Sequence, residues 1–150
     1  MLQLHRIRSF ATVICLMGLV SACAGPIQHA TPSGKVEVTI NNVTKKTVKD
    51  KLVDTMVNMG FIVTKSDDNV VVADRPNPTA MIFGTNIGTP VSRITLQLVQ
   101  NGKTVRVIAD CAVIASPNTA YENRIDMNGN ADTARLQTQL DYIKGDLERK

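Results

Sequence analysis

The feature that most constrains the fold is an Asn101-Gly102 pair between two segments that alternate between polar and apolar residues. Asn-Gly is a favoured two-residue turn of a β-hairpin, because both turn positions need a positive φ. With this pair as the turn, Leu98 faces Val105 and the apolar side chains of both strands share one face. The same register places Arg93 opposite Asp110 as an attractive cross-strand pair. The sequence therefore predicts a long hairpin with one buried face.

Shorter elements are predicted before this hairpin. Residues 35–40 alternate in polarity and indicate a half-buried strand. The next element is a helix that begins after Thr44, a good N-cap, and ends at Gly60. Its apolar residues recur at helical spacing: Val48, Leu52, Met56 and Met59. Residues 61–64 and 70–73 then predict two short strands joined by a polar turn.

Two further segments complete the predicted domain. An apolar segment, residues 80–83, follows a proline-bounded loop, and residues 131–150 predict a C-terminal helix. The apolar stripe of this helix is Leu136, Leu140, Ile143 and Leu147. Strand, helix, four or five antiparallel strands and helix is the order of a two-layer α+β sandwich. We therefore expect residues 35–150 to form one domain, with a mainly antiparallel sheet of four to six strands and both helices on one face.

The N-terminal segment has the pattern of a signal peptide. Arg6 and Arg8 precede an apolar run over residues 10–22, which is too short to span a bilayer as a helix. We expect residues 1–22 to be removed. The mature chain then has a net charge of about +2, which is no nucleic-acid signature, so no nucleic-acid partner is expected.

The end of this segment, Val20-Ser21-Ala22-Cys23, resembles the lipobox of bacterial lipoproteins. The resemblance covers the first 23 residues and implies that Cys23 becomes the new N-terminus and carries lipid chains. Ala24 in the next position is similar to the class sorted to the outer membrane. Residues 23–34 then form the lipidated cysteine and a flexible tether. The alternative is a soluble secreted protein cut by the ordinary small-residue rule.

Few residues of the mature chain are suited to catalysis. His29 is its only histidine and falls in the tether, where we expect nothing to hold it against a nucleophile. Cys111 lies on the inward stripe of the hairpin and is predicted to be an inert, buried thiol. The acids of the predicted turns are interpreted as solvated residues: Asp67, Asp68, Asp74, Glu122 and Asp126. We expect a protein that is not an enzyme and uses no cofactor.

One cluster is a weak candidate for a calcium site. Four oxygen-bearing side chains stand at alternate positions: Asp126, Asn128, Asn130 and Asp132. An EF-hand would have Gly at position 131 and Glu at position 137, where this chain has Ala and Gln. Turns and helix caps favour the same residue types, so we expect no metal here.

Apolar residues on the outer face of the hairpin indicate a covering segment or a partner. These residues are Val99, Ile108, Ala112 and Ile114. The long loop over residues 116–129 carries Tyr121 and Arg124, residue types that anchor interfaces. We predict that Tyr121, Arg124, Val99 and Ile108 bind a partner.

Together these features predict a periplasmic lipoprotein anchored in the outer membrane. The order of its elements is loosely similar to that of the small α+β domains of accessory lipoproteins in envelope assembly or secretion machines. We therefore expect a non-enzymatic interaction module with an envelope protein as its partner. Two alternatives stay open. A lipid or small-ligand carrier needs an apolar pocket of several hundred cubic ångströms between sheet and helices, and an envelope hydrolase needs two converging carboxylates.

Overall fold

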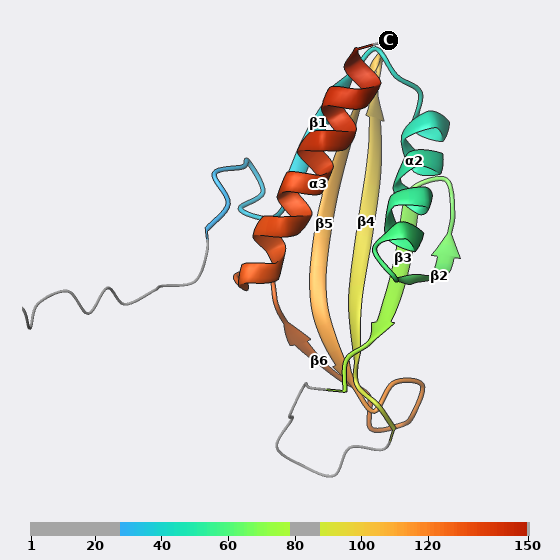
Figure 1. Cartoon of the computed structure of the whole chain (residues 1–150), viewed down its shortest axis with the longest axis vertical. Helices are drawn as coiled ribbons and strands as arrows, with labels where there is room; N and C mark the ends of the chain where they lie inside the picture. The colour runs from blue at the N-terminus through green and yellow to red at the C-terminus, as the bar shows by residue number, and fades with distance from the viewer. Residues whose placement is uncertain (1–27, 79–87, 150) are drawn as a thin grey trace, which may run out of the picture.

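The computed structural model describes residues 28–78 and 88–149. They form a six-stranded antiparallel sheet with two helices on one of its faces (Figure 1). The predicted two-layer α+β sandwich is confirmed. The predicted signal peptide, Cys23 and the apolar segment 80–83 lie outside the described residues.

Eight elements follow one another along the chain: β1 (Glu37–Asn41), α2 (Lys45–Asn58), β2 (Ile62–Ser66), β3 (Val70–Pro76), β4 (Val91–Asn101), β5 (Thr104–Ala115), β6 (Asn123–Asp126) and α3 (Ala131–Glu148). The strand order across the sheet is β1-β5-β4-β3-β2, and β6 pairs with β5. The helices run in opposite directions over the sheet, and the loops that join them to the strands lie at both ends (Figure 1).

Both helices begin at capping side chains. The Thr44 hydroxyl accepts a hydrogen bond from the Thr47 backbone N–H at 3.2 Å, and α2 is followed by Gly60 at φ +79°. The Asn130 side chain accepts from the Asp132 backbone N–H at 3.2 Å and starts α3. Such caps satisfy N–H groups that have no partner within the helix. The predicted cap at Thr44 and the predicted end at Gly60 are confirmed.

The register of the β4–β5 hairpin differs from the prediction by two residues. Asn101 pairs with Thr104, and the turn residues are Gly102 and Lys103. Gly102 has a φ of +57°, whereas Lys103 is not among the described residues with a positive φ. This is the pattern of a II′ turn, which needs glycine only at its first central position. Leu98 consequently faces Val107, and every side chain stays on its predicted face because the shift is an even number of residues.

This shift removes the predicted cross-strand pair. Arg93 faces Ala112, and Asp110 faces Thr95. The Arg93 guanidinium instead forms two hydrogen bonds of 2.8 Å to the Asp74 carboxylate on β3. The prediction of an Arg93–Asp110 pair is therefore wrong.

The hydrophobic core lies between the helices and the sheet. Its largest fully buried side chains include Ile40, Leu52, Met56, Leu96, Leu140 and Ile143. The predicted apolar stripes of the two helices supply Leu52, Met56, Leu140 and Ile143, and alternation along the strands supplies Ile40 and Leu96.

Polar side chains of α3 cover the free edge of β1. The Gln137 side chain accepts from the Glu37 N–H and donates to the Glu37 carbonyl, both at 3.0 Å. Near the other end of the helix, Glu148 accepts from the Asn41 backbone N–H at 2.8 Å. These bonds replace a strand partner, which protects the edge from pairing with another chain.

The loop that was predicted over residues 116–129 contains a strand. Within it, β6 pairs with the end of β5 and places Arg124 opposite Ile114. The segment before β6 is a compact turn in which Ser116 and Asn118 have positive φ values of 49° and 61°. This strand has only four residues and no clear alternation of polar and apolar side chains, so pairing with β5 determines its conformation.

Candidate functional site

The end of the predicted tether is bound to the domain. The His29 ring Nε2 lies 2.9 Å from the Thr133 hydroxyl at the start of α3. Farther along, the Ser33 backbone N–H donates to the Glu37 carboxylate at 3.2 Å, and the Lys35 ammonium lies 2.6 Å from Asp110. We expected His29 to lie in a flexible tether with nothing to hold it against a nucleophile. The structure corrects the expectation of a flexible segment for the described end of the tether, residues 28–34, because His29 contacts α3 and Ser33 contacts β1.

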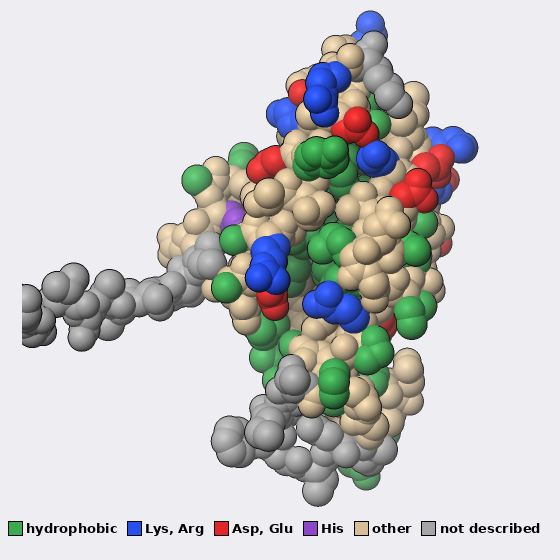
Figure 2. Space-filling model, viewed as in Figure 1, with side chains coloured by type: hydrophobic (Ala, Val, Ile, Leu, Met, Phe, Trp, Pro, Cys, Tyr) green, Lys and Arg blue, Asp and Glu red, His purple; other side chains and the backbone are tan. Residues whose placement is uncertain are grey.

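A groove opens on the helix-bearing side of the sheet, where α2 has ended and α3 begins. Its apolar lining comprises Met59, Phe61, Ile94, Val113, Met127 and Leu136, and its cavity volume is about 170 Å³. Figure 2 shows hydrophobic side chains at the surface between and below the helices, with Lys and Arg side chains beside them. The groove is smaller than the several hundred cubic ångströms expected of a carrier that encloses a whole ligand.

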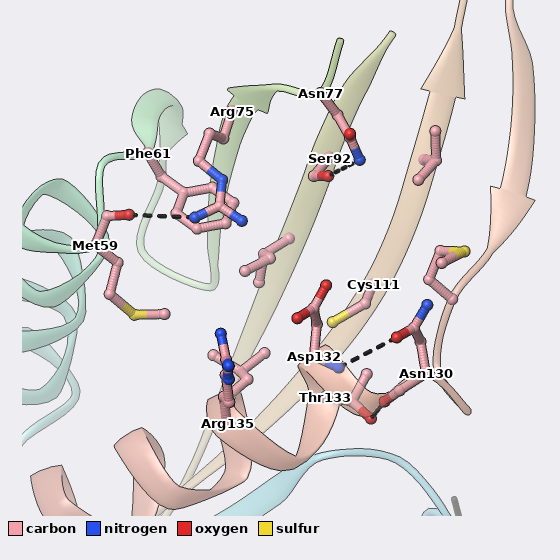
Figure 3. Close-up of a pocket in the computed structure, with 14 residues that line it drawn as sticks. Met59, Phe61, Arg75, Asn77, Ser92, Cys111, Asn130, Asp132, Thr133 and Arg135 are labelled. Atoms are coloured by element: carbon pink, nitrogen blue, oxygen red, sulfur yellow. Dashed lines mark hydrogen bonds between the residues drawn. The ribbon is translucent and has the colours of Figure 1, made fainter. Parts of the chain in front are cut away.

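Charged side chains stand around this groove. Arg75 from β3 and Arg135 from α3 lie on opposite sides of it, while Asp132 lies beside Cys111 (Figure 3). The Arg75 guanidinium is 4.6 Å from the centre of the Phe61 ring, a cation–π contact that holds it at the rim. Neither arginine forms an ion pair with any residue that the structure describes. The rim therefore offers two positive charges and one negative charge.

Cys111 lies in the floor of the groove and is partly buried. Burial raises the pKa of its thiol to about 11, and the negative charges of Asp110, Asp126 and Asp132 act in the same direction. A thiol with this pKa is almost fully protonated at neutral pH and reacts slowly. The inward position that was predicted for Cys111 is confirmed, although the groove leaves the side chain partly accessible.

The four residues predicted to bind a partner are spread along the sheet. Val99 is 51% exposed near the hairpin turn, and Ile108 is half-buried on the neighbouring strand. Tyr121 is 73% exposed at the far end of the sheet. Six strand residues, or about 20 Å, separate Ile108 from Ile114, the residue that pairs with Arg124. Val99 and Ile108 are neighbours, whereas Tyr121 and the backbone of Arg124 lie at the opposite end, although the Arg124 guanidinium reaches back to Asp110.

Arg124 takes part in an internal network on the outer face. Its guanidinium pairs with the Asp110 carboxylate, which also accepts from the Asn128 side chain at 3.0 Å. Burial raises the pKa of Asp110, but the hydrogen bonds from Lys35 and Asn128 and the charge of Arg124 outweigh it. The pKa of Asp110 is therefore lower than its ordinary value. Arg124 thus has an intramolecular partner, and a protein that binds here would compete with Asp110 for the guanidinium.

Two apolar residues of the outer face beside this network are not available to a partner. Ala112 is 3% exposed and Ile114 is 1% exposed. Of the four apolar residues on the outer face of the hairpin, only Val99 and Ile108 remain accessible. The accessible apolar part of this face is therefore near the hairpin turn.

Three of the four side chains of the calcium candidate use their oxygens in separate structural hydrogen bonds. Asp126 accepts from the Asn128 N–H at 2.7 Å, and Asn128 accepts from the Cys111 N–H at 3.0 Å. Asn130 caps α3 at the Asp132 N–H. In the part of the chain that the structure describes, no cluster of three or more His, Cys, Asp or Glu residues is arranged to hold a metal ion.

The other acids singled out by the sequence are not brought together in the groove. Asp74 binds Arg93, and Glu122 lies 3.8 Å from the same guanidinium. Asp67 and Asp68 lie in the β2–β3 turn, where they contact lysines. Asp132 is the one carboxylate among the described residues that line the groove.

Sequence reasoning missed the groove and its two arginines. Arg75 stands at the end of a strand and Arg135 on a polar helix face, and neither position has a local signal of binding. Phe61 is the one hint, because a lone aromatic residue follows the helix stop at Gly60. These residues are separated by up to 74 positions, so only the packing of α2, α3 and the sheet brings them together.

Neither described helix is long and apolar enough to cross a membrane. In comparisons with known proteins, no family model matches the chain. No curated protein matches it either.

Proposed function

We propose that this chain is a lipoprotein of the bacterial outer membrane. Cys23 carries the lipid, and the domain faces the periplasm as a non-enzymatic interaction module. Its partner is an envelope protein, and its place is that of an accessory subunit in an assembly or secretion complex. The lipobox resemblance at residues 20–23 supports the anchor.

The observation that carries this proposal is the contact between the tether and the domain. His29 is bound at the start of α3, only six residues after Cys23. Six extended residues span about 20–22 Å. An anchor on Cys23 would therefore hold the domain close to the membrane, with the end of the domain at which α3 begins nearest to the bilayer. The distance from the bilayer would be limited by six residues and not by the whole predicted tether. A held orientation suits a module that presents one surface to a partner.

The surface that suits a protein partner is the outer face near the hairpin turn. No described helix covers this face of the sheet (Figure 1). Val99 and Ile108 are accessible there, beside the ion pair in which Arg106 binds Glu37 at 2.6 and 2.8 Å. Apolar centres with a charged rim are typical of specific protein interfaces.

The anchor is tested on the full chain expressed in a bacterial envelope. We expect the mature protein to carry diacylglyceryl and acyl groups on Cys23 by mass spectrometry, and to sediment with outer membranes. Cys23→Ser should abolish both the acylation and the processing before residue 23. Cys15→Ser, in the predicted leader, is the matched control and should leave both unchanged. An unmodified mature chain in the soluble periplasmic fraction would contradict the proposal.

The partner surface is tested by photo-crosslinking in native membranes. A crosslinking residue at position 99 should give one discrete adduct with an envelope protein. Position 139, exposed on α3, is the control and should not give that adduct. A Val99→Glu substitution should remove the adduct formed from a crosslinker at position 108. The same pattern of adducts from positions 99 and 139, or no adduct from either, would overturn this choice of surface.

A further inference from the structure

We infer that the groove binds an anionic phospholipid of the membrane that anchors the chain. The phosphate lies between Arg75 and Arg135, and part of one acyl chain lies on the apolar floor. This inference rests on the proposed lipid anchor, and it identifies the ligand class of a site for which the sequence has no motif.

Position is the first argument. Thr133, the residue that holds His29, is itself part of the groove lining. Because His29 follows Cys23 by six residues, an anchor on Cys23 brings this end of the domain within about 20–22 Å of the lipid headgroups. Of the ligands present at that distance from a bilayer, phospholipids are the most concentrated.

Charge is the second argument. Arg75 is held against the Phe61 ring, so its guanidinium is ordered before a ligand arrives. Arg135 makes no ion pair with a described residue and lies on the opposite side of the groove (Figure 3). Asp132 opposes these charges, but the lining still has a net charge of +1, and the positive end of α3 adds to it. Planar guanidinium groups bind phosphate through two parallel hydrogen bonds, so this pair fits a phosphodiester.

The apolar floor is the third argument. Phe61, Ile94 and Val113 are each less than 8% exposed and form part of the apolar lining of the groove. A cavity volume of about 170 Å³ is too small for a whole lipid and large enough for several methylene groups. An inorganic phosphate has no apolar part and would leave this apolar lining exposed to water. A zwitterionic lipid carries a positive group that the two arginines would repel. An anionic amphiphile satisfies both parts of the groove.

Cys111 provides a readout inside the groove. In the acylated mature chain Cys23 is blocked, so labelling of the Cys111 peptide by a maleimide reports how accessible the groove floor is. The purified full-length mature protein is placed in neutral detergent at about pH 9, where enough thiolate forms to react. Short-chain phosphatidylglycerol, phosphatidylcholine with the same acyl chains, and glycerol 3-phosphate are then added separately.

We expect phosphatidylglycerol to slow the labelling of Cys111 about tenfold at a concentration ten times its Kd, and the other two additives to change the rate less than about twofold. Arg75→Gln with Arg135→Gln should abolish the protection. Lys46→Gln with Lys103→Gln is the matched control, because it removes the same charge near the hairpin turn and should retain the protection. The substitution at Arg75 also removes its contact with Phe61 and so could disturb the groove. Arg135→Gln alone removes no described contact, and it should still weaken the protection.

Equal protection by phosphatidylcholine, full protection by glycerol 3-phosphate, or unchanged protection in the double arginine variant would each overturn the inference. The mass of the Cys23 peptide is read in the same samples. If Cys23 is acylated but phosphatidylglycerol does not protect Cys111, the lipid site is contradicted and the proposed anchor stands. If Cys23 is unmodified but phosphatidylglycerol protects Cys111, the anchor is contradicted and the lipid site stands.

Discussion

The two ends of the helix-bearing side differ in how well the sheet is covered. Near the hairpin turn, Ile40 and Val105 of the sheet and Leu52 of α2 are fully buried. At the other end, Cys111 is partly exposed and the groove opens beside it. The same two strands, β4 and β5, provide the floor in both regions. The difference therefore comes from the helices and not from the sheet.

Element length explains this difference. The 12 residues of β5 extend about 40 Å, whereas the 14 residues of α2 extend about 21 Å and the 18 residues of α3 about 27 Å. Both helices cover the end of the sheet near the hairpin turn, where the Lys45 N–H donates to Gln100 and Glu148 accepts from the Asn41 N–H. Because the sheet is longer than the helices, some apolar side chains at its other end are not covered by a helix. The groove lies over these side chains.

The largest expected effect is in the closely packed end. Leu52→Ala should lower the free energy of unfolding by about 2–5 kcal/mol, because it leaves a cavity in the core. Met59→Ala, at the rim of the groove, should cost only about 1 kcal/mol, since that side chain is already partly exposed. Denaturant titration of both variants measures the contrast. Equal losses would show that the two ends are packed alike.

The groove floor is tested by thiol chemistry without added lipid. With a pKa of about 11, Cys111 should react with maleimide at pH 7 at least tenfold more slowly than an ordinary thiol of pKa about 8.5, because its smaller thiolate fraction outweighs the higher nucleophilicity of its thiolate. Its rate should rise about tenfold per pH unit up to that pKa. Ala134→Cys in a Cys111→Ser background places a thiol at an exposed position on α3 and is the control. Similar rates at the two positions would mean that the groove is open to solvent.

The pH dependence of the free energy of unfolding distinguishes the contribution of the apolar core from that of the ion pairs on the outer face. The hydrogen bonds from Arg106 lower the pKa of Glu37 from its ordinary value of 4.5, although burial opposes them. A carboxyl whose pKa is lower in the folded chain stabilises the fold above the unfolded pKa and loses that contribution as the pH falls through the folded value. Stability should therefore decline below about pH 4.5, and Glu37→Gln should make that decline shallower.

The comparison for this titration is the core variant. Leu52→Ala should lower stability by a similar amount at every pH, because no charge changes. Asp50→Asn, which removes a carboxylate that is 58% exposed on α2, is the charge-matched control and should keep the decline of the unsubstituted chain. An unchanged acid slope in Glu37→Gln would contradict the assigned role of the Glu37–Arg106 pair.

The smallest expected effect is at the bound tether. His29→Ala should lower the free energy of unfolding by about 0.5–1.5 kcal/mol, the usual net value of one hydrogen bond. Thr133 keeps its second hydrogen bond, to the Asn130 carbonyl, so the start of α3 should survive. Thermal unfolding measures the loss. A loss as large as that of Leu52→Ala would mean that residues 28–34 belong to the core rather than to its surface.

Particular residues show how far local pattern reaches. Thr44, Gly60 and the stripe from Val48 to Met56 predict α2 almost to the residue, because caps and helical periodicity depend on neighbours in sequence. The faces of β4 and β5 were predicted correctly although the register was not. Alternation specifies a face, whereas the choice between two adjacent turn positions depends on small differences in backbone energy.

The sequence by itself determined the class of the fold, the extents of the helices, the inward side of each long strand and the resemblance of residues 1–23 to a lipoprotein leader. Only the tertiary structure decided that His29 binds α3, that Arg93 pairs with Asp74, and that Arg75, Arg135 and Cys111 share one groove. The physical reason is the distance along the chain over which each interaction acts. Periodicity and capping act over a few residues, while a site between layers depends on how far each helix extends over the sheet.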